Sequence, residues 1–204
     1  MEHSTFVKQM LMASINELSQ TPENYAVHPD KDFTRNRKIG FNNLLLLLLT
    51  IEDDCLREEL YRFFGRTAET PTKAAFCRQQ AKLKEDALWQ LLRIFSWKSD
   101  PTLYKNLYRL VACDGSAADI YRDEKDTDTY FEPNGKSSRG FNQIHINALY
   151  SILDRQFLDV LVQPARKRNE YHAFCEMVDR AGNDHPTIYI VDRGMLPAMI
   201  SPMS

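Results

Sequence analysis

The sequence is poor in glycine and in cysteine. Its 204 residues include 7 glycines, 9 prolines and 4 cysteines, which excludes collagen-like repeats and long glycine-rich linkers. The cysteines, Cys55, Cys77, Cys113 and Cys175, lie tens of residues apart and form no C-x-x-C pair. Such spacing is typical of reduced thiols rather than of a disulfide framework or a zinc knuckle. We therefore expect four cysteines without a special role.

Long hydrophobic runs and an excess of one charge are also lacking. The longest apolar run, within residues 39–51, is too short for a bilayer, which takes about 20 apolar residues to cross. The first residues lack the cationic and apolar regions of a secretory signal, so we expect a cytoplasmic protein without a transmembrane helix. Lys and Arg number 26 and Asp and Glu 28, for a formal net charge of -2. Any surface that binds a polyanion must therefore be local.

What remains is the composition of a folded protein. Hydrophobic residues make up 43% and charged residues 26% of the chain, close to the average of globular domains. A length of 204 residues corresponds to one large domain or two small ones. A change of pattern near Pro101 favours two parts, residues 1–100 and residues 101–204.

The first part, residues 1–100, has the apolar spacing of helices. Apolar residues recur every three or four positions, which marks one face of a helix. The predicted helices cover residues 4–18, 55–64, 73–82 and 85–97. The six leucines 44–49 favour a helix buried on all sides over a coiled-coil seam, because a seam needs polar positions between its leucines.

The second part, residues 101–204, changes to strands. The predicted elements are a strand that stops at Asp114, a loop or loose hairpin over 119–140, strands over 144–152 and 157–162 that pair as a hairpin, a helix capped by Asn169, and a strand over 187–191. This order is an α/β pattern with an antiparallel start. In the strand 144–152, polar residues alternate with apolar ones, so we expect His145 to face solvent.

Two aspartates follow the two most apolar strands of this part. Asp114 ends the run Leu-Val-Ala-Cys, and Asp192 ends the run Ile-Tyr-Ile-Val. If the two strands are neighbours in one sheet, both carboxylates converge at its edge, where they could hold Mg²⁺ for phosphodiester cleavage. The alternative is that both are turn residues, because Asp before Gly is a common way to leave a strand.

Several blocks of the sequence carry a resemblance to a known family. In the second part they are residues 111–116 (VACDGS), 141–150 (FNQIHINALY), 163–170 (QPARKRNE) and 190–194 (IVDRG), and in the first part residues 31–38 (KDFTRNRK) and 71–82 (PTKAAFCRQQAK). In this order the blocks resemble those of the DDE insertion-sequence transposases of the IS-four-like group. The resemblance spans about residues 30–194.

The resemblance implies a fold class of α+β: an N-terminal all-helical region that binds DNA, residues 1–100, followed by an RNase H-like α/β domain, residues 101–204. It implies Asp114 and Asp192 as the first and second catalytic carboxylates, which hold Mg²⁺ or Mn²⁺. In such enzymes water cuts the DNA at the transposon end, and the freed 3′-hydroxyl attacks target DNA. Positioning and charge neutralisation carry that chemistry.

The sequence departs from the family after Gly194. The family's third carboxylate is a Glu in a Tyr-Arg-Glu-Lys signature well beyond the second Asp, but only 12 residues follow Asp192. We therefore expect a truncated copy with an incomplete RNase H-like domain, produced by a frameshift or truncation near Gly194. The alternatives are a DNA-binding inhibitor of full-length transposase without enzymatic activity, and a remnant without function.

Two basic clusters in the first part are the candidate DNA-binding surface. Residues 31–38 have a local charge of +3 and residues 73–84 one of +4, which favours contact with phosphates. The candidate residues are Arg35, Arg37, Lys38, Lys73, Arg78, Lys82 and Lys84. The alternative is a solvated helix face. The resemblance implies as partners the inverted repeats of the transposon, as double-stranded DNA, and a second copy or full-length transposase as a dimer. It implies no membrane partner and a bacterial protein associated with the nucleoid.

Overall fold

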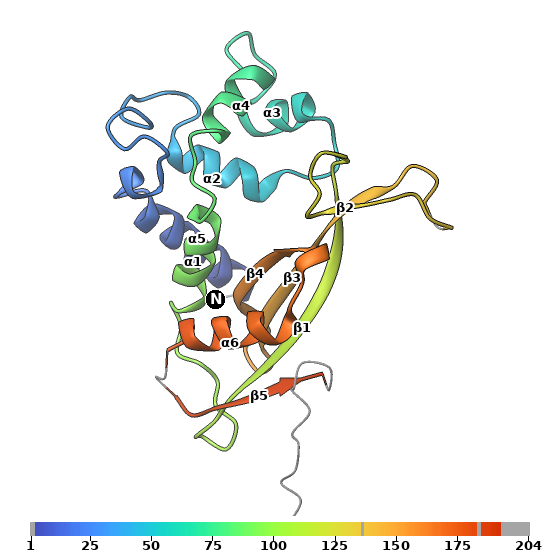
Figure 1. The fold of residues 1–204 in the computed structure, drawn as a ribbon. Coiled ribbons are helices and arrows are strands. Elements are labelled where there is room, and N and C mark those ends of the chain that lie inside the picture. The colour runs from blue at the N-terminus through green and yellow to red at the C-terminus, as the bar shows by residue number, and fades with distance from the viewer. Residues whose placement is uncertain (1–2, 136, 183–184, 193–204) are drawn as a thin grey trace, which may run out of the picture. The chain divides into compact units, whose positions relative to one another are not determined.

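The computed structural model describes residues 3–135, 137–182 and 185–192. The chain divides into two compact units, unit 1 (Met1–Lys98) and unit 2 (Ser99–Ser204), whose elements are labelled in Figure 1. Within the described residues, unit 1 consists of helices and unit 2 contains a mixed sheet with one α-helix. The expected α+β class is therefore confirmed. The segment beyond Gly194, where the sequence departs from the family pattern, lies outside the described residues.

The helices of unit 1 lie where the apolar spacing predicts them. They are α1 (His3–Leu18), α2 (Phe41–Thr50), α3 (Leu56–Phe64), α4 (Lys73–Gln80) and α5 (Ala87–Ser96). A 3-10 turn that was not predicted, η1 (Pro22–Tyr25), follows α1. Thr72 caps α4, because its hydroxyl oxygen accepts a hydrogen bond from the N–H of Ala75 at 3.2 Å. Such a cap stabilises a helix by about 1 kcal/mol.

The leucine-rich helix α2 lies between two hydrophobic clusters of unit 1. Leu45 packs in one cluster with residues of α1 and α5, and Leu44 and Leu47 pack in the other with residues of α3 and α4. Because α2 is covered on two sides, its leucines need no polar positions between them. Leu49 differs from the expectation, since 46% of it is exposed.

The sheet of unit 2 is mixed. Its strands are β1 (Arg109–Ile120), β2 (Tyr130–Phe131), β3 (Phe141–Ser151), β4 (Gln156–Pro164) and β5 (Thr187–Val191). Strand β3 pairs antiparallel with β1 on one side and with β4 and β2 on the other, and β5 pairs parallel with β1. The hairpin β3–β4 is as predicted, and its turn includes Arg155 at a positive φ of 56°.

One helix, α6 (Glu170–Arg180), packs against this sheet (Figure 1). The side chain of Asn169 caps it as predicted, accepting from the N–H of His172 at 3.0 Å. Met177 of α6 is fully buried against Val111, Cys113 and Leu149. The α6 side of β1 and β3 is therefore the core side of unit 2.

The predicted end of the first strand is wrong. Strand β1 does not stop at Asp114 but continues to Ile120, and its residues pair with β3 as far as Ile120 and Asn142. The second half of β1 is small and polar, so its apolar pattern ends at Cys113 while its backbone ladder continues. Backbone pairing, which side-chain hydrophobicity does not report, decides the length of this strand.

The predicted orientation of His145 is also wrong. His145 is only 3% exposed and lies on the same face of β3 as the buried Asn147 and Leu149. The apolar residues Ile144 and Ile146 lie on the other face and are only half-buried. The alternation along β3 is real, but α6 covers the more polar face.

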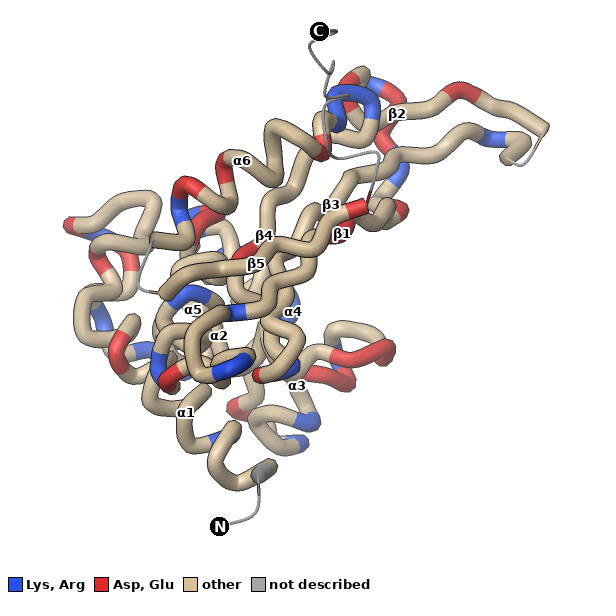
Figure 2. Tube along the Cα trace, turned by 90° about the horizontal axis from the view of Figure 1, so that it is seen from below, with Lys and Arg blue, Asp and Glu red and all other residues tan. Residues whose placement is uncertain are grey.

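None of the helices in the described ranges combines the length and the apolarity that a membrane-spanning helix requires. Cationic and acidic residues are interspersed along the chain in both units, as Figure 2 shows. Each unit therefore carries residues of both charge signs.

Candidate functional site

Asp114 and Asp192 lie at the same level of two neighbouring strands. The last paired residues of the parallel strands β1 and β5 are Cys113 and Val191, and each aspartate is the next residue along its strand. Adjacent strands lie about 4.8 Å apart, so the parallel pairing brings the two backbones that carry these carboxylates side by side. Both aspartates are exposed. The expected neighbouring strands are therefore present, but Asp114 lies within β1 and not at an edge of the sheet.

The Asp114 carboxylate lies beside the core thiol of Cys113. Its Oδ1 accepts a hydrogen bond from the N–H of Gly115 at 2.8 Å. Burial, together with the negative charges of Asp114 and Glu170, raises the pKa of Cys113 to about 11. Because both carboxylates disfavour the thiolate, they create a negative potential around Cys113.

This arrangement fits a divalent ion in part. Mg²⁺ is commonly held by one or two carboxylates together with waters and substrate phosphates, and Asp114 and Asp192 supply two exposed carboxylates next to each other. Among the residues that the structure describes, no group of three His, Cys, Asp or Glu side chains could hold a metal ion. Within the described ranges, the two aspartates are thus candidate ligands without a third such side chain grouped with them.

Beneath β1, Glu170 meets the buried ring of His145. Glu170 is the first residue of α6, and its Oε1 lies 3.0 Å from Nε2 of His145. This is the distance of an ion pair, but its geometry is not that of a hydrogen bond, and neither ring nitrogen has a hydrogen-bond partner among the described residues. A Cβ on Gly115 would lie only 2.5 Å from Nε2. Gly115 is thus needed where β1 passes over this ring.

Three of the predicted DNA-binding residues line one pocket of unit 1. Arg35 and Arg37 come from the loop before α2, and Lys82 follows α4. The pocket has a volume of about 410 Å³ and is lined by Asp30, Lys31, Asp32, Phe33, Thr34, Arg35, Arg37, Ile39, Gly40, Gln79 and Lys82. We call it the basic pocket. Its lining contains four cations and two acids, and it brings together both basic clusters of the sequence.

Two other predicted residues, Lys38 and Lys84, form hydrogen bonds with loops of unit 1. The Lys38 ammonium donates to the backbone oxygen and the carboxylate of Glu69 at 2.7 and 2.6 Å, and lowers the pKa of that carboxyl. The Lys84 ammonium donates to the backbone oxygen of Asn24 at 2.8 Å. Lys38 and Lys84 are therefore engaged in loop contacts.

Lys73 and Arg78 lie on α4 and are exposed. They are not part of the basic pocket. Each is placed on the surface of unit 1, where a solvated helix face and a phosphate contact are equally compatible with its position.

Three further residues line the basic pocket: Lys31 adds a cation, Phe33 an aromatic ring and Gln79 an amide. Lys31 belongs to the first basic cluster of the sequence, and the Gln79-Gln80 pair beside Arg78 is a sequence signal for amides that can contact phosphates and base edges. Sequence reasoning missed Phe33. The side-chain oxygen of Gln79 is buried without a hydrogen-bond partner among the described residues.

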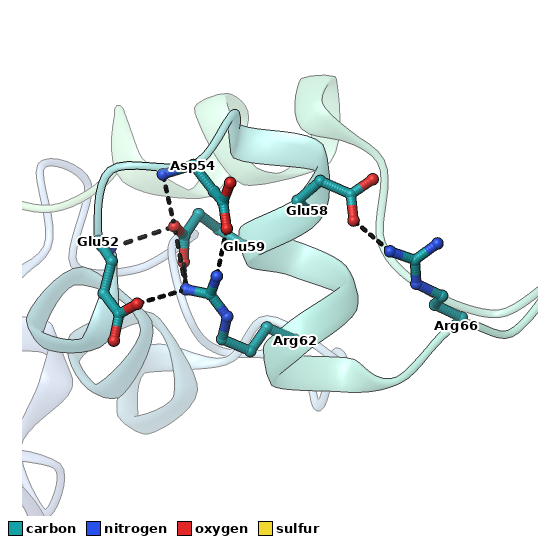
Figure 3. A network of polar contacts seen from close by, with 6 residues as sticks. All are labelled: Glu52, Asp54, Glu58, Glu59, Arg62 and Arg66. Carbon is teal, nitrogen blue, oxygen red and sulfur yellow. Dashed lines mark hydrogen bonds and ion pairs between the residues drawn. The ribbon is translucent and has the colours of Figure 1, made fainter.

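A second cluster of charged residues in unit 1 contacts the loop before α3 (Figure 3). Arg62 forms ion pairs with Glu52, Asp54 and Glu59. Glu59 is only 2% exposed, and its Oε1 also accepts from the N–H groups of Glu52 and Asp54, each at 3.2 Å. Since its carboxylates and cations are already paired with one another, we interpret this cluster as one that stabilises the loop and not as a ligand site.

Comparisons with protein-family models, with curated proteins and with solved structures returned no match.

Proposed function

We propose that this chain is a DDE-class transposase of an insertion sequence. In this proposal unit 1 binds double-stranded DNA at the transposon ends, and unit 2 is RNase H-like and carries two carboxylates of the catalytic centre. The observation that carries the proposal is the pairing of β1 with β5, which brings the backbones of Asp114 and Asp192 side by side at the point where β5 ends. The strand order β4-β3-β1-β5, with β5 parallel to β1, supports an RNase H-like fold.

A divalent ion such as Mg²⁺ or Mn²⁺, when bound, supplies the charge that activates water and stabilises the leaving oxygen in phosphodiester cleavage. In this chain Asp114 and Asp192 are the residues that would hold it. Their own contribution would be two exposed carboxylates beside the end of β5. Besides burial, the charge of Asp114 raises the pKa of Cys113, and the same negative charge attracts a cation.

The DNA contacts of the proposal fall mainly on Arg35 and Arg37. Both are exposed and line the basic pocket, and no carboxylate of the described residues forms an ion pair with either. The ammonium groups of Lys38 and Lys84 already have partners. We therefore expect the seven predicted basic residues to contribute unequally to DNA affinity, with more from Arg35 and Arg37 than from Lys38 and Lys84.

Salt dependence of DNA binding tests this proposal. Each phosphate that a cation neutralises contributes about -0.9 to the slope of log affinity against log salt on duplex DNA. For a fluorescent mixed-sequence duplex, replacing Arg35 and Arg37 together with Ala should reduce the slope by up to about two units. The matched control, replacing Lys38 and Lys84 together with Ala, should change it little. Equal slopes for wild type and the Arg35/Arg37 variant would contradict the assignment.

A second candidate function is DNA binding without cleavage, as an inhibitor of full-length transposase. It is favoured by the lack of a third carboxylate beside Asp114 and Asp192 in the described ranges, because groups that act as a unit lose most of their activity when one is missing. Incubation of the purified chain with transposon-end DNA and Mn²⁺ separates the two. Cleavage that disappears in Asp114→Asn supports the transposase, and binding without cleavage supports the inhibitor.

A further inference from the structure

The basic pocket is a recess and not a flat patch of charge. Its volume of about 410 Å³ lies within the range of roughly 300–1,000 Å³ that is typical of ligand pockets. An internal phosphate of a DNA duplex is joined to sugars on both sides and lies on a convex surface, so cations on a flat surface can contact it. A recess is suited instead to a group that ends a chain and can enter it.

The loop that carries one side of the pocket is held by its own contacts. The backbone oxygen of His28 accepts from the N–H groups of Lys31 and Asp32 at 3.0 and 2.8 Å. The buried Asp32 carboxylate accepts from the N–H of His28 at 3.1 Å, and Nζ of Lys82 lies 3.7 Å from its other oxygen. The loop therefore needs no ligand to order it, which lowers the cost of binding one, and Lys82 is partly neutralised by Asp32.

Three other cations of the lining are open to a ligand. Lys31, Arg35 and Arg37 are exposed and form no ion pair within the part of the chain that the structure describes. The lining also contains Asp30, and three cations against one acid leave an excess of two positive charges. A phosphate monoester carries a charge of about -1.5 to -2 near neutral pH and three acceptor oxygens, whereas each phosphate inside a DNA strand carries a single charge. The open cations therefore match a monoester.

The N-terminus of α2 adds to the positive potential of these cations. Gly40, the N-cap residue of α2, lines the pocket, and no side chain of the described residues caps this end of the helix. The first N–H groups of a helix have no partner within the helix and carry a partial positive charge, which favours a phosphate beside them. Backbone and side chains of the lining thus favour the same kind of ligand.

We propose that the basic pocket binds the terminal phosphate of a DNA strand. The three free oxygens of that phosphate accept from Lys31, Arg35 and Arg37, and its single ester bond leads out of the pocket to the strand. Charge-assisted hydrogen bonds of this kind are the strong ones in proteins. This inference rests on the proposed DNA binding and assigns one of its contacts to a strand end.

The test compares three internally labelled fluorescent duplexes of identical sequence at constant ionic strength. One has hydroxyl groups at all strand ends, one carries 5′-phosphates and one carries 3′-phosphates. Wild-type protein should bind at least one phosphorylated duplex about tenfold more tightly than the hydroxyl duplex, the effect of one added hydrogen bond between charged groups. Because the three duplexes differ in nothing else, the comparison isolates the terminal phosphate.

Variants of the cations locate the preference. Replacing Arg35 and Arg37 together with Gln should abolish the difference between phosphorylated and hydroxyl duplexes. The matched control replaces Lys8 and Arg57 together with Gln, which removes two exposed cations outside the pocket, and should preserve the difference. A preference for the phosphorylated duplexes that persists in the Arg35/Arg37 variant would overturn the assignment to this pocket.

The outcomes for the wild-type chain separate this inference from the proposed function. Equal affinity for the three duplexes would overturn the terminal-phosphate site and leave the DNA binding intact, whereas failure to bind any of them would overturn the proposed function. Inorganic phosphate, titrated into the isotope-labelled chain, represents a free anion. Shifts of the pocket's amide NMR signals with phosphate, together with equal affinity for the three duplexes, would assign the pocket to a free anion and overturn the strand-end site.

Discussion

At the scale of single residues, Gly115 is where the candidate site and the core of unit 2 meet. A Cβ at this position would lie 2.5 Å from Nε2 of His145 and 3.2 Å from Oδ1 of Asn147. Both side chains are buried and cannot move without cost. Gly115→Ala should therefore lower the free energy of unfolding by about 1–3 kcal/mol, the usual effect of overpacking a core, as measured by urea denaturation.

Gly135→Ala is the control for this prediction, since a Cβ there has no neighbour within 4 Å. It should leave the free energy of unfolding nearly unchanged. In a background of His145→Ala, the cost of Gly115→Ala should shrink, because the clashing ring is gone. A Gly115→Ala protein as stable as wild type would contradict the close approach of β1 to His145.

Asp154 gives unit 2 a dependence on pH. Burial alone would raise the pKa of Asp154, but hydrogen bonds from the Ser151 hydroxyl and from Thr102 lower it below its ordinary value of 3.8. The lowered pKa means that this stabilisation is present above that value and is lost as the pH falls through the pKa of the folded state. Asp154→Asn should therefore be less stable than wild type near neutral pH.

We expect a difference of about 1 kcal/mol in the free energy of unfolding, because Asp154 is only half-buried and solvent weakens its interactions. The difference should shrink as the pH is lowered below 3.8, the ordinary value, and through the lower pKa of the folded state. Urea denaturation at a series of pH values measures it. A gap between the two proteins that stays constant over this range would show that the charge of Asp154 is not the cause.

At the scale of elements, the loop before α3 depends on one buried carboxylate. Glu59 accepts from two backbone N–H groups of the loop and pairs with Arg62, as Figure 3 shows. Glu59→Ala removes all three contacts, so we expect a loss of about 2 kcal/mol in the free energy of unfolding. The matched variant Glu58→Ala breaks only the more exposed pair with Arg66 and should cost less than about 0.5 kcal/mol. Similar losses in both variants would argue against the loop contact.

The strands show which features of an element could be predicted from the sequence. Alternation along residues 144–152 predicts β3, but not that the face with His145 and Asn147 is the buried one. The packing of α6 decides that face, and it pairs Glu170 with His145 from another segment of the chain. The length of β1 could not be predicted from the apolar pattern either, because the ladder with β3 continues beyond the apolar run.

The candidate site also has a part that could be predicted from the sequence and a part that could not. The neighbouring positions of Asp114 and Asp192 follow from two apolar strands that each end in an aspartate, once β1 and β5 are paired in parallel. The basic pocket could be predicted only as two separate basic clusters. That Phe33 and Gln79 line the same pocket depends on how the loop before α2 folds against α4, and local sequence carries no signal for that.

At the scale of the whole molecule, the two units have separate hydrophobic cores and, in the proposal, separate tasks. Unit 1 binds the end of the DNA, and unit 2 provides the carboxylates. The central claim is that Asp114 and Asp192 act together on one divalent ion. It does not depend on DNA binding or on cleavage, so it can be measured directly.

The most direct measurement is the paramagnetic broadening of amide NMR signals when Mn²⁺ is added to the isotope-labelled chain. We predict that the signals of residues 113–115 and of Val191 broaden first, and that either Asp114→Asn or Asp192→Asn abolishes the effect. Asp119→Asn, at an exposed position farther along β1, is the control and should broaden like wild type. Broadening that persists in both single variants, or none in the wild-type chain at millimolar Mn²⁺, would contradict the account.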